Sequence, residues 1–383
     1  MDNPVLRPTV ATQAPVDASA RVVAEARRLG FDAVGFARAD EPLEADHERY
    51  ARFVADGKHG RMAWLAEDVE ARRRLDGDAI LPGARTVVCL ARRYARSAEE
   101  EAKDPAIAQI VARYARGQDY HNHLRKKLRK LAAFVRTLGP DVRARPLVDV
   151  EPILERAWAA RAGIGFIGKN GLVIVPGQGS YALLGEVVTT LALAPGTPMT
   201  ERCGSCTRCL DACPTGAFDA PFVLDPRRCV AYFSIEAPGD VDEDLARRAG
   251  SRLFGCDDCQ SVCPFNRTSP PSLLSTRQFH PLDRWRDAAL PDLVCVDEAS
   301  FATLTEGSPL RRAGWSGLAL DAVRVARFWL ETLEPGDARR RDAEVTLARA
   351  ARFEVEAVRA AAAAASTAAA AALVPPVTRA PPP

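Results

Sequence analysis

A run of four cysteines in the middle of the chain constrains its fold more than any other feature. Cys203, Cys206, Cys209 and Cys213 are followed by Pro214, which is the C-x2-C-x2-C-x3-C-P spacing of bacterial ferredoxins. In that pattern three cysteines bind one [4Fe–4S] cluster, and the fourth binds another because the chain has turned away from the first. The run therefore predicts a second cluster whose other ligands lie elsewhere in the chain.

A second run supplies those ligands. Cys256, Cys259 and Cys263 precede Pro264 and are one cysteine short of the full pattern, and Cys229 in DPRRCVAY is the natural replacement. Zinc also takes C-x2-C pairs, but the triple spacing and the two Cys-Pro steps favour clusters. The crossed assignment gives one cluster to Cys203, Cys206, Cys209 and Cys263, and the other to Cys213, Cys229, Cys256 and Cys259.

Two further cysteines lie outside this region. Cys89 in TVVCLA and Cys295 in LVCV sit in apolar runs, so we expect both to be small core residues rather than ligands. The sequence has no basic segment followed by an apolar run that would direct secretion, so the clustered cysteines are not expected to form disulfides. The longest apolar tract, 360–374, is shorter than the roughly 20 residues that span a bilayer. We therefore expect a cytoplasmic protein without a membrane segment.

The length and charge of the chain set further bounds. With 383 residues and 47% hydrophobic content, the chain is long enough to bury two cores. Its net charge of +2 indicates neither a nucleic-acid nor a membrane partner for the chain as a whole, so a surface for either must be a local patch. The best candidate is the stretch HNHLRKKLRK with Arg125, Lys126, Lys127, Arg129 and Lys130, joined by Arg311 and Arg312 downstream.

Alternating helical and strand-like segments predict a first domain of the α/β or α+β class. SARVVAEARRLG has the spacing of a helix, TVVCLARRY and ARPLVDV that of strands, and the basic segment 116–139 that of a second helix. We expect the chain to divide into a disordered tail (1–16), this domain (17–200), a cysteine domain (201–270), a helical region (271–336) and an alanine-rich helix with a disordered proline-rich tail (337–383).

No flavin or nicotinamide fingerprint accompanies the cysteines. Gly163, Gly165 and Gly168 have the G-x-G-x-x-G spacing, but they follow a helix rather than a strand. The segment DYHNHL, 119–124, is similar to the start of the D-x-H-x-x-G motif by which some corrinoid proteins supply a histidine to cobalt. Leu124 replaces the glycine, and we expect His121 to be a surface histidine.

Seven segments in a fixed order carry a resemblance to one family. They are RYARGQDYHNHLRKKL (113–128), VDVEPILERAWAARAGIGFIGKNGLVI (148–174), GSYALLGEV (179–187), CGSCTRCLDACPTGAF (203–218), RRCVAYFSIE (227–236), RLFGCDDCQSVCPFNR (252–267) and GSPLRRAG (307–314). Over about residues 17–326 the chain resembles the epoxyqueuosine reductases. The resemblance implies a nitroreductase-like domain and a ferredoxin-like domain that hold base-off cobalamin between them, fed by two [4Fe–4S] clusters.

The implied reaction is the final step of queuosine biosynthesis. Co(I) cobalamin reduces an epoxide at the tRNA wobble position by two electrons, and the products are an alkene and water. The implied partners are tRNA carrying epoxyqueuosine and a low-potential electron donor, flavodoxin or ferredoxin, and we expect a monomer. Longer family members have C-terminal HEAT-like repeats that contact tRNA, which the alanine-rich segment replaces here. Two alternatives stay open: a corrinoid iron–sulfur reductase of a small molecule, similar to reductive dehalogenases, and an electron carrier without a substrate of its own.

The resemblance also implies site residues. Asp149 in LVDVEP matches the proton donor, and we expect burial against the corrin to raise its pKa; its alternative role is to cap the following helix. Val150-Glu151 departs from the family's small pair, so Glu151 either alters the pKa of Asp149 or points to solvent. Corrin contacts are implied for Arg72, Ala112, Val173, Leu184, Cys256 and Asp257. At Ala112 the chain departs from the family, which has a hydroxylic residue there. Each matched position could instead serve ordinary packing, except Arg72, whose alternative role is a solvated charge on a helix.

Overall fold

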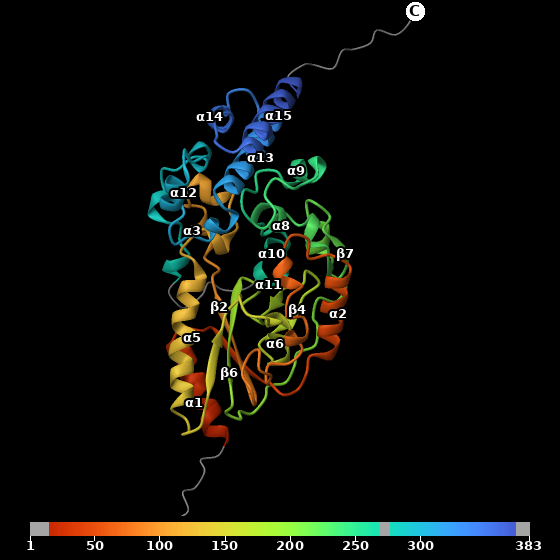
Figure 1. Cartoon of the computed structure of the whole chain (residues 1–383), viewed down its shortest axis with the longest axis vertical. Coiled ribbons are helices and arrows are strands. Elements are labelled where there is room, and N and C mark those ends of the chain that lie inside the picture. The colour runs from red at the N-terminus through yellow and green to blue at the C-terminus, as the bar shows by residue number, and fades with distance from the viewer. Residues whose placement is uncertain (1–14, 268–275, 373–383) are drawn as a thin grey trace, which may run out of the picture.

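A four-stranded antiparallel sheet forms the centre of the first half of the chain. The computed structural model describes residues 15–267 and 276–372, and within them this sheet has the order β1-β2-β6-β3 (Figure 1). Every pairing in it is antiparallel, so the domain is α+β rather than a parallel α/β fold. The strands are β1 (Ala33–Arg38), β2 (Thr86–Arg93), β3 (Ala144–Leu147) and β6 (Ala182–Thr189).

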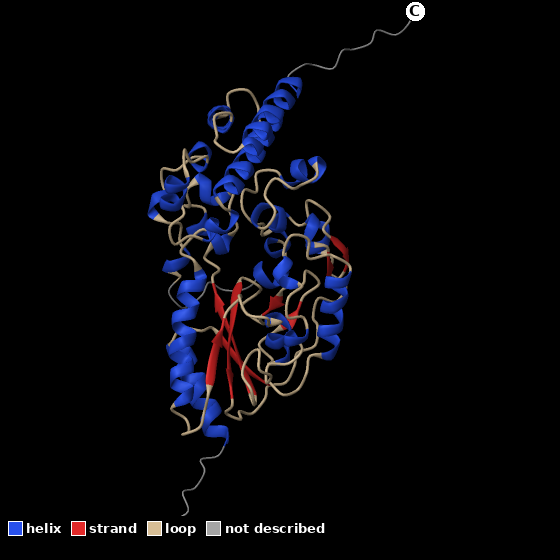
Figure 2. Ribbon diagram, in the orientation of Figure 1, coloured by secondary structure: helices blue, strands red, loops and turns tan. Residues whose placement is uncertain are grey.

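Helices cover both faces of this sheet, as Figure 2 shows. All eight residues of β2 are buried, which is expected of a strand with no solvated face. One face packs on α1 (Pro15–Arg28) and α5 (Tyr120–Arg136), where Leu124, Leu128 and Leu131 recur at helical spacing and are fully buried. The other face packs on α6 (Glu155–Arg161), while α2 (Glu44–Ala55) lies at the edge of the domain.

A short hairpin joins this domain to the cysteine region. Its strands β4 (Phe166–Ile167) and β5 (Val173–Ile174) place Phe166 and Ile174 against Cys263, and the rings of Phe166 and Phe265 are 5.4 Å apart. The cysteine region itself consists of α7 (Arg208–Asp211), β7 (Phe218–Ala220), β8 (Val223–Leu224), α8 (Val230–Ile235), α9 (Glu243–Ala249), α10 (Asp258–Ser261) and α11 (Pro264–Arg267).

The helices that follow form the largest apolar core in the described part of the chain. They are α12 (Glu298–Leu304), α13 (Trp315–Thr332), α14 (Ala338–Ala350) and α15 (Glu356–Ala372). The core also takes in Val111, between α4 (Ala106–Gln109) and α5, and Phe254 of the cysteine region, and these two residues form a parallel bridge. The short helix α3 (Ala98–Glu101) precedes α4. All three parts of the chain therefore meet here.

The C-terminal part of the chain differs from the prediction. The sequence predicts one alanine-rich helix in a separate segment that begins at residue 337. Two helices are present, and both pack on α13, because Ala343, Leu347 and Val358 are buried in the same core as α13. Phe353 is buried in the turn between them. The small alanine side chains let α15 approach α13 closely.

The ends of the chain complete the description. Helix α1 begins at Pro15, two residues before the domain boundary expected from the sequence. Most of the expected N-terminal tail and the proline-rich segment 373–383 lie outside the described residues. In the ranges 15–267 and 276–372, no helix has the length and apolar character needed to cross a bilayer.

Candidate functional site

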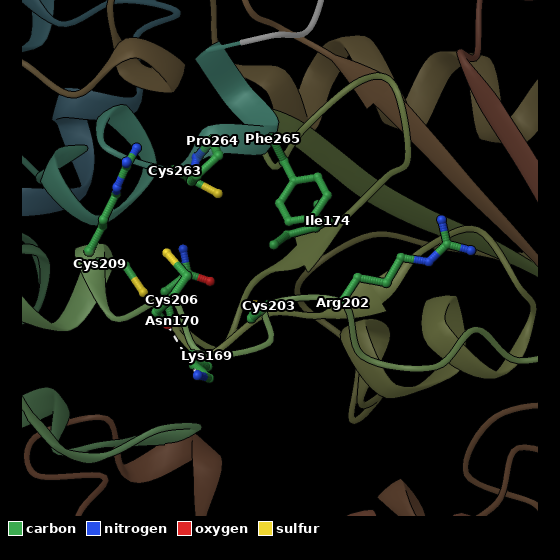
Figure 3. A pocket seen from close by; sticks show the side chains of 11 residues that line it. Lys169, Asn170, Ile174, Arg202, Cys203, Cys206, Cys209, Cys263, Pro264 and Phe265 are labelled. Carbon is green, nitrogen blue, oxygen red and sulfur yellow. Dashed lines mark hydrogen bonds between the residues drawn. The ribbon is translucent and has the colours of Figure 1, made fainter.

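Four of the clustered cysteines surround one cavity. Cys203, Cys206, Cys209 and Cys263 line a space of about 210 Å³ together with Lys169 and Phe265. Figure 3 shows Cys206 and Cys263 on opposite sides of this space, although they come from different segments of the chain. The Lys169 ammonium closes one side, because Nζ donates to the carbonyl oxygens of Gly204 at 2.5 Å and Cys206 at 3.1 Å. We call this set the outer cysteine group.

The other four cysteines are the ones that the crossed assignment gives to the second cluster. Each of Cys229, Cys256 and Cys259 has a pKa raised by burial and by the charge of other members of the set, and burial raises the pKa of Cys256 to about 12. The charge of Cys213 raises the pKa of Cys229, and the charge of Cys229 raises the pKa of both Cys256 and Cys259. Grouped thiols that are hard to ionise alone suit a positively charged metal centre, which binds the thiolate form. We call Cys213, Cys229, Cys256 and Cys259 the inner cysteine group.

The structure brings Cys203, Cys206, Cys209 and Cys263 around one cavity, as the crossed assignment expects, and the assignment of the other four cysteines to a second cluster stays a prediction. All ten cysteines are free of disulfides. Cys89 lies in β2 with no exposed surface, and Cys295 is buried with its thiol directed at the carbonyl oxygen of Asp292 at 3.5 Å. The prediction that both are core residues is confirmed.

Asp149 lies in a tight turn directly after β3. Its φ of 62° is in the left-handed region, which few residues other than glycine adopt and which aspartate tolerates better than most. Its main-chain N–H donates to Oε1 of Glu155 at 2.9 Å, and the N–H of Val148 donates to Oε2 of Glu151 at 3.1 Å. Glu151 thus holds the turn instead of pointing freely into solvent. The Asp149 side chain is 51% exposed, so a substrate can reach it.

His121 and Tyr120 meet the carboxylate of Asp149. Oδ2 of Asp149 lies 2.8 Å from Nε2 of His121 and accepts from the Tyr120 hydroxyl at 3.0 Å. The other ring nitrogen of His121, Nδ1, lies 2.8 Å from Oδ1 of Asp119, which caps the N-terminus of α5. The Tyr120 ring stacks on His121 at 4.1 Å between centroids. His121 keeps 29% of its side chain exposed, but both of its ring nitrogens have carboxylate partners, because the first turn of α5 faces the end of β3.

The two carboxylates control the charge of His121. Burial alone lowers the pKa of His121, but the hydrogen bonds to Asp119 and Asp149 outweigh it and raise the pKa to about 9. The hydrogen bond from His121 in turn holds the pKa of Asp149 below its usual range, against the effect of burial. The expected raised pKa of Asp149 is therefore not found. Near neutral pH the pair consists of an imidazolium that donates to a carboxylate.

Two buried glutamates lie behind this pair. Burial and the charge of Asp149 raise the pKa of Glu155 to about 7. Glu186 on β6 has no exposed surface, and neither of its carboxyl oxygens has a hydrogen-bond partner within the described residues. Burial raises the pKa of Glu186 well above its usual value, so this carboxyl is neutral. Sequence reasoning missed Tyr120, His121 and Glu155; the Asp-Tyr-His triplet at a helix N-terminus was the available signal.

Three of the residues matched to corrin contacts lie together. The N–H of Ala112 donates to the carbonyl of Phe254 at 2.9 Å, and the next N–H, of Arg113, donates to Oδ2 of Asp257 at 2.7 Å. Cys256 is the neighbour of Asp257 in sequence. Tyr114 connects this place to Asp149, because its ring meets that of Tyr120 edge to face at 6.0 Å.

The other three matched residues have different surroundings. Val173 is buried and Leu184 partly buried in the core between the sheet and α6. Arg72 is buried, donates from Nη2 to the carbonyl of Trp64 at 3.2 Å and lies over the Tyr50 ring, while its Nε has no partner within the described residues. The interpretation of Arg72 as a solvated helix charge is therefore wrong.

The cations expected to contact RNA are not all available. Lys127 is half-buried, donates to the carbonyl of Leu29, and has a pKa lowered by burial, so it leaves the expected patch. Arg312 pairs with Glu236 at 2.9 Å and stacks on the exposed Trp64 ring at 4.8 Å. Its charge also lowers the pKa of Asp149, which places the Arg312–Trp64 pair near the acid. The cations that stay exposed are Lys126, Arg129, Lys130, Arg311 and Arg312, and Arg125 is half-buried.

Comparison with known proteins gives consistent similarities. Residues 202–266 match the family described as "4Fe-4S double cluster binding domain", and residues 74–150 match "Epoxyqueuosine reductase QueG, DUF1730". An epoxyqueuosine reductase of Xanthomonas campestris pv. campestris is 42% identical over 307 residues, which are 78% of this chain and 84% of the relative. One of Gloeobacter violaceus is 41% identical over 308 residues, covering 79% of this chain and 94% of the relative.

Solved structures show the same similarity in three dimensions. An epoxyqueuosine reductase bound to an epoxyqueuosine-modified stem loop of tRNA-Tyr superposes with a TM-score of 0.75 at 26% identity, covering 93% of this chain and all of that one. The enzyme of Bacillus subtilis, in a structure with its catalytic aspartate loop swung out of the active site, gives 0.75 at 25% identity with the same coverage.

The charge of His121 can be tested by titration. In protein labelled with ¹³C at histidine Cε1, the His121 signal should titrate near pH 9, because two carboxylates stabilise its protonated form. His121→Gln assigns this signal among the five histidines. His123 is the internal control, since burial lowers its pKa to about 4. A His121 midpoint at or below the ordinary value of 6.5 would contradict the assignment.

Proposed function

We propose a reaction for this chain on the premise that it belongs to the epoxyqueuosine reductase family. It is 42% identical to one member of that family over 307 residues. The chain reduces the epoxide of epoxyqueuosine in tRNA to the alkene of queuosine. The reaction consumes two electrons and two protons and releases the epoxide oxygen as water. The observation that carries the proposal is the Asp149–His121 pair, which puts a proton source beside a domain of the double [4Fe–4S] type. No observation favours the small-molecule reductase or the electron carrier considered as alternatives.

The cysteine groups hold the electron path. We assign one [4Fe–4S] cluster to the outer group and one to the inner group, each with four thiolates, as a crossed double-cluster domain requires. In this proposal residues 17–200 are the nitroreductase-like domain, 201–270 the ferredoxin-like domain and 271–336 a helical region, followed by the segment 337–383.

The described residues fit a corrin between these parts. Arg72 has a buried Nε that lacks a partner, and a bound polar group would satisfy it. Both ring nitrogens of His121 are engaged by carboxylates, so this histidine is not free to bind cobalt, which fits base-off cobalamin. The residues proposed to hold cobalamin are Arg72, Ala112, Asp149, Val173, Leu184, Cys256 and Asp257. When bound, cobalamin supplies the two-electron reduction of the epoxide carbon.

Asp149 and His121 supply the proton that lets the oxygen leave. An alkoxide is a poor leaving group, so the epoxide oxygen must be protonated as its bond to carbon breaks. His121 donates from Nε2 to the same Oδ2 atom of Asp149 that the Tyr120 hydroxyl fixes. Because Asp149 is ionised at rest, the proton passes from Nε2 of His121 to Oδ2 of Asp149 and from there to the epoxide oxygen, while Asp119 stabilises the imidazolium before the transfer.

The substrate reaches Asp149 past charged and aromatic side chains. Arg312 and Trp64 lie near the acid and present a guanidinium and an exposed ring, groups that contact phosphates and bases in RNA. Lys126, Arg129, Lys130 and Arg311 add exposed positive charge for the phosphate backbone. We propose that the enzyme acts as a monomer in the cytoplasm, where its tRNA substrate is found, and receives electrons from flavodoxin or ferredoxin.

The crossed cluster assignment predicts the iron content. Anaerobically reconstituted protein should bind about eight irons with matching sulfide. Cys263→Ala should lose about half of this iron, because it removes a ligand from the outer group only. Cys89→Ala, which changes a buried thiol in β2, is the control and should keep about eight irons. Stoichiometric zinc, or full iron in Cys263→Ala, would contradict the assignment.

Base-off binding without a protein ligand predicts a spectroscopic result. Cobalamin added to the protein and reduced to Co(II) should show no nitrogen superhyperfine splitting by electron paramagnetic resonance, because His121 is held by Asp119 and Asp149. The spectrum of His121→Gln should match that of the parent. Nitrogen splitting that disappears in His121→Gln would show that the histidine binds cobalt after all.

The role of Asp149 predicts a loss of turnover without a loss of cofactors. Asp149→Asn should keep both clusters and bind cobalamin, since the amide has nearly the same shape. With epoxyqueuosine-containing tRNA and a strong chemical reductant, its turnover should fall by roughly 10²–10⁴-fold, the usual contribution of a positioned general acid.

Glu151→Gln is the matched control for this change. Its side-chain oxygen can still accept the N–H of Val148, so the turn and the rate should be retained. The assignment of the acid is wrong if Asp149→Asn turns over at the parent rate while Glu151→Gln is inactive.

A further inference from the structure

Three exposed arginines surround the outer cysteine group without ion-pair partners. Arg202 precedes Cys203, Arg208 precedes Cys209, and Arg267 ends α11. Within residues 15–267 and 276–372 none of the three contacts a carboxylate, whereas other arginines of the cysteine region are paired, as Arg227 is with Asp225. In Figure 3 the Arg202 side chain extends outward from the cavity. These cations are therefore free to meet charge from outside the molecule.

Two acidic residues nearby, Glu201 and Asp211, form no ion pair with the three arginines within the described residues. Oε1 of Glu201 accepts the main-chain N–H of Cys203, and Oδ2 of Asp211 accepts the Thr207 hydroxyl at 2.8 Å. Each carboxylate is thus engaged within its own loop. Lys169, bound to the carbonyl oxygens of the same cysteine loop, adds a further positive charge at the cavity.

A hollow lies next to the cavity, on the face that carries the three arginines. It has a volume of about 550 Å³, lies between α7, α10 and α11, and shares Arg208 with the outer cavity. Ala212 and Val262 give it apolar lining, and two cations, Arg208 and Arg267, lie at it with one carboxylate, Asp211. An apolar centre with charged groups around it is the usual composition of a protein-docking surface.

The two cysteine groups differ in what they face. The inner group is continuous with Asp257 and Tyr114, and through Tyr120 with Asp149. The outer group opens instead on the cavity and on the face of the three arginines. Electrons bound for the reaction at Asp149 therefore have to enter at the outer group and leave from the inner one.

We propose that Arg202, Arg208 and Arg267 form the docking surface for an acidic one-electron carrier protein. The inference rests on the proposed function, which requires two electrons per epoxide. Each docked carrier is oxidised by one electron and the cluster of the outer group is reduced by one, with no bond made and no proton moved. Two carriers thus complete one turnover. Positive charge around the entry point steers an acidic partner to it and fixes its orientation.

The surface can be tested by binding rather than by activity. Reconstituted parent protein is titrated with an acidic flavodoxin, and separately with an acidic ferredoxin, at low and high salt. The double variant Arg202→Glu with Arg208→Glu should bind at least one of these carriers roughly tenfold more weakly than the parent at low salt, because it reverses two charges at the docking surface. The difference should shrink at high salt.

The matched control carries the same change of charge elsewhere. Arg341 and Arg352 are exposed, lie on and just after α14, and contact no carboxylate in the described part of the chain. Arg341→Glu with Arg352→Glu should therefore bind the carrier within about twofold of the parent. Equal weakening in both double variants would show only an effect of net charge and would overturn the proposal.

Three other outcomes also overturn it. One is that neither carrier binds the parent in a salt-sensitive way. Another is that Arg202→Glu with Arg208→Glu weakens binding of a tRNA stem loop but not of the carriers, which assigns the surface to RNA. The third is that the variant shifts the midpoint potential of the outer cluster with carrier binding unchanged, so that the arginines serve the cluster alone.

Turnover with a small chemical reductant separates the two proposals. The charge-reversed variant should reduce epoxyqueuosine-containing tRNA at the parent rate when the carrier is bypassed. If the parent itself fails to turn over under these conditions, the proposed function fails, whatever the carrier-binding result.

Discussion

The crossing of the two cysteine runs is the constraint on which the rest of the arrangement depends. Cys263 completes the outer group although it lies 54 residues beyond Cys209 in the chain, and Cys213 belongs with the inner group. Helices α7 and α10 must therefore lie against each other. This packing turns one group toward the outside of the molecule and the other toward Tyr114. In the proposed account, electrons enter at the outer group and leave from the inner one.

A second constraint is the sharing of charge between His121 and its two carboxylates. Asp119 and Asp149 each lie 2.8 Å from a different ring nitrogen of His121. The single positive charge of the imidazolium is therefore shared by two carboxylates. This arrangement gives the site a proton, held by His121, while Asp149 stays ionised. Asp119, the N-cap residue of α5, holds the other side of the His121 ring and so connects the site to that helix. Burial keeps the carboxyl of Glu186 neutral and raises the pKa of Glu155, and the charges of the neighbouring carboxylates add to both effects. The site is therefore a network of acids in which the histidine sets the protonation state.

The sequence predicts some parts of this arrangement well for a physical reason. Metal ligation fixes cysteine spacing, so the outer group of Cys203, Cys206, Cys209 and Cys263 can be inferred without a structure. Burial of one helix face fixes apolar spacing, which is why the helix with Leu124 and Leu128 is recognisable. Cys89 and Cys295 follow from the same logic, because a thiol inside an apolar run packs as a small apolar residue.

Other parts depend on contacts that no local pattern records. The pairing of His121 with Asp149 joins residues 28 apart and requires the end of β3 to face the start of α5. In the sheet β6 lies between β2 and β3 and pairs antiparallel with both. The composition of each strand does not distinguish this antiparallel order from a parallel one. Lys127 belongs to a basic run, but its place on the helix directs it to the carbonyl of Leu29. The resemblance to a family identified Asp149, and only the structure shows which neighbours control its proton.

The modified nucleosides of tRNA test the central claim most directly. Total tRNA from a strain that lacks this protein should accumulate epoxyqueuosine and contain no queuosine, and a plasmid copy of the parent gene should restore queuosine. The complementation matters, because it ties the missing step to this chain rather than to a neighbouring gene. Unchanged queuosine in the strain that lacks the protein, with no epoxyqueuosine detected, would contradict the account.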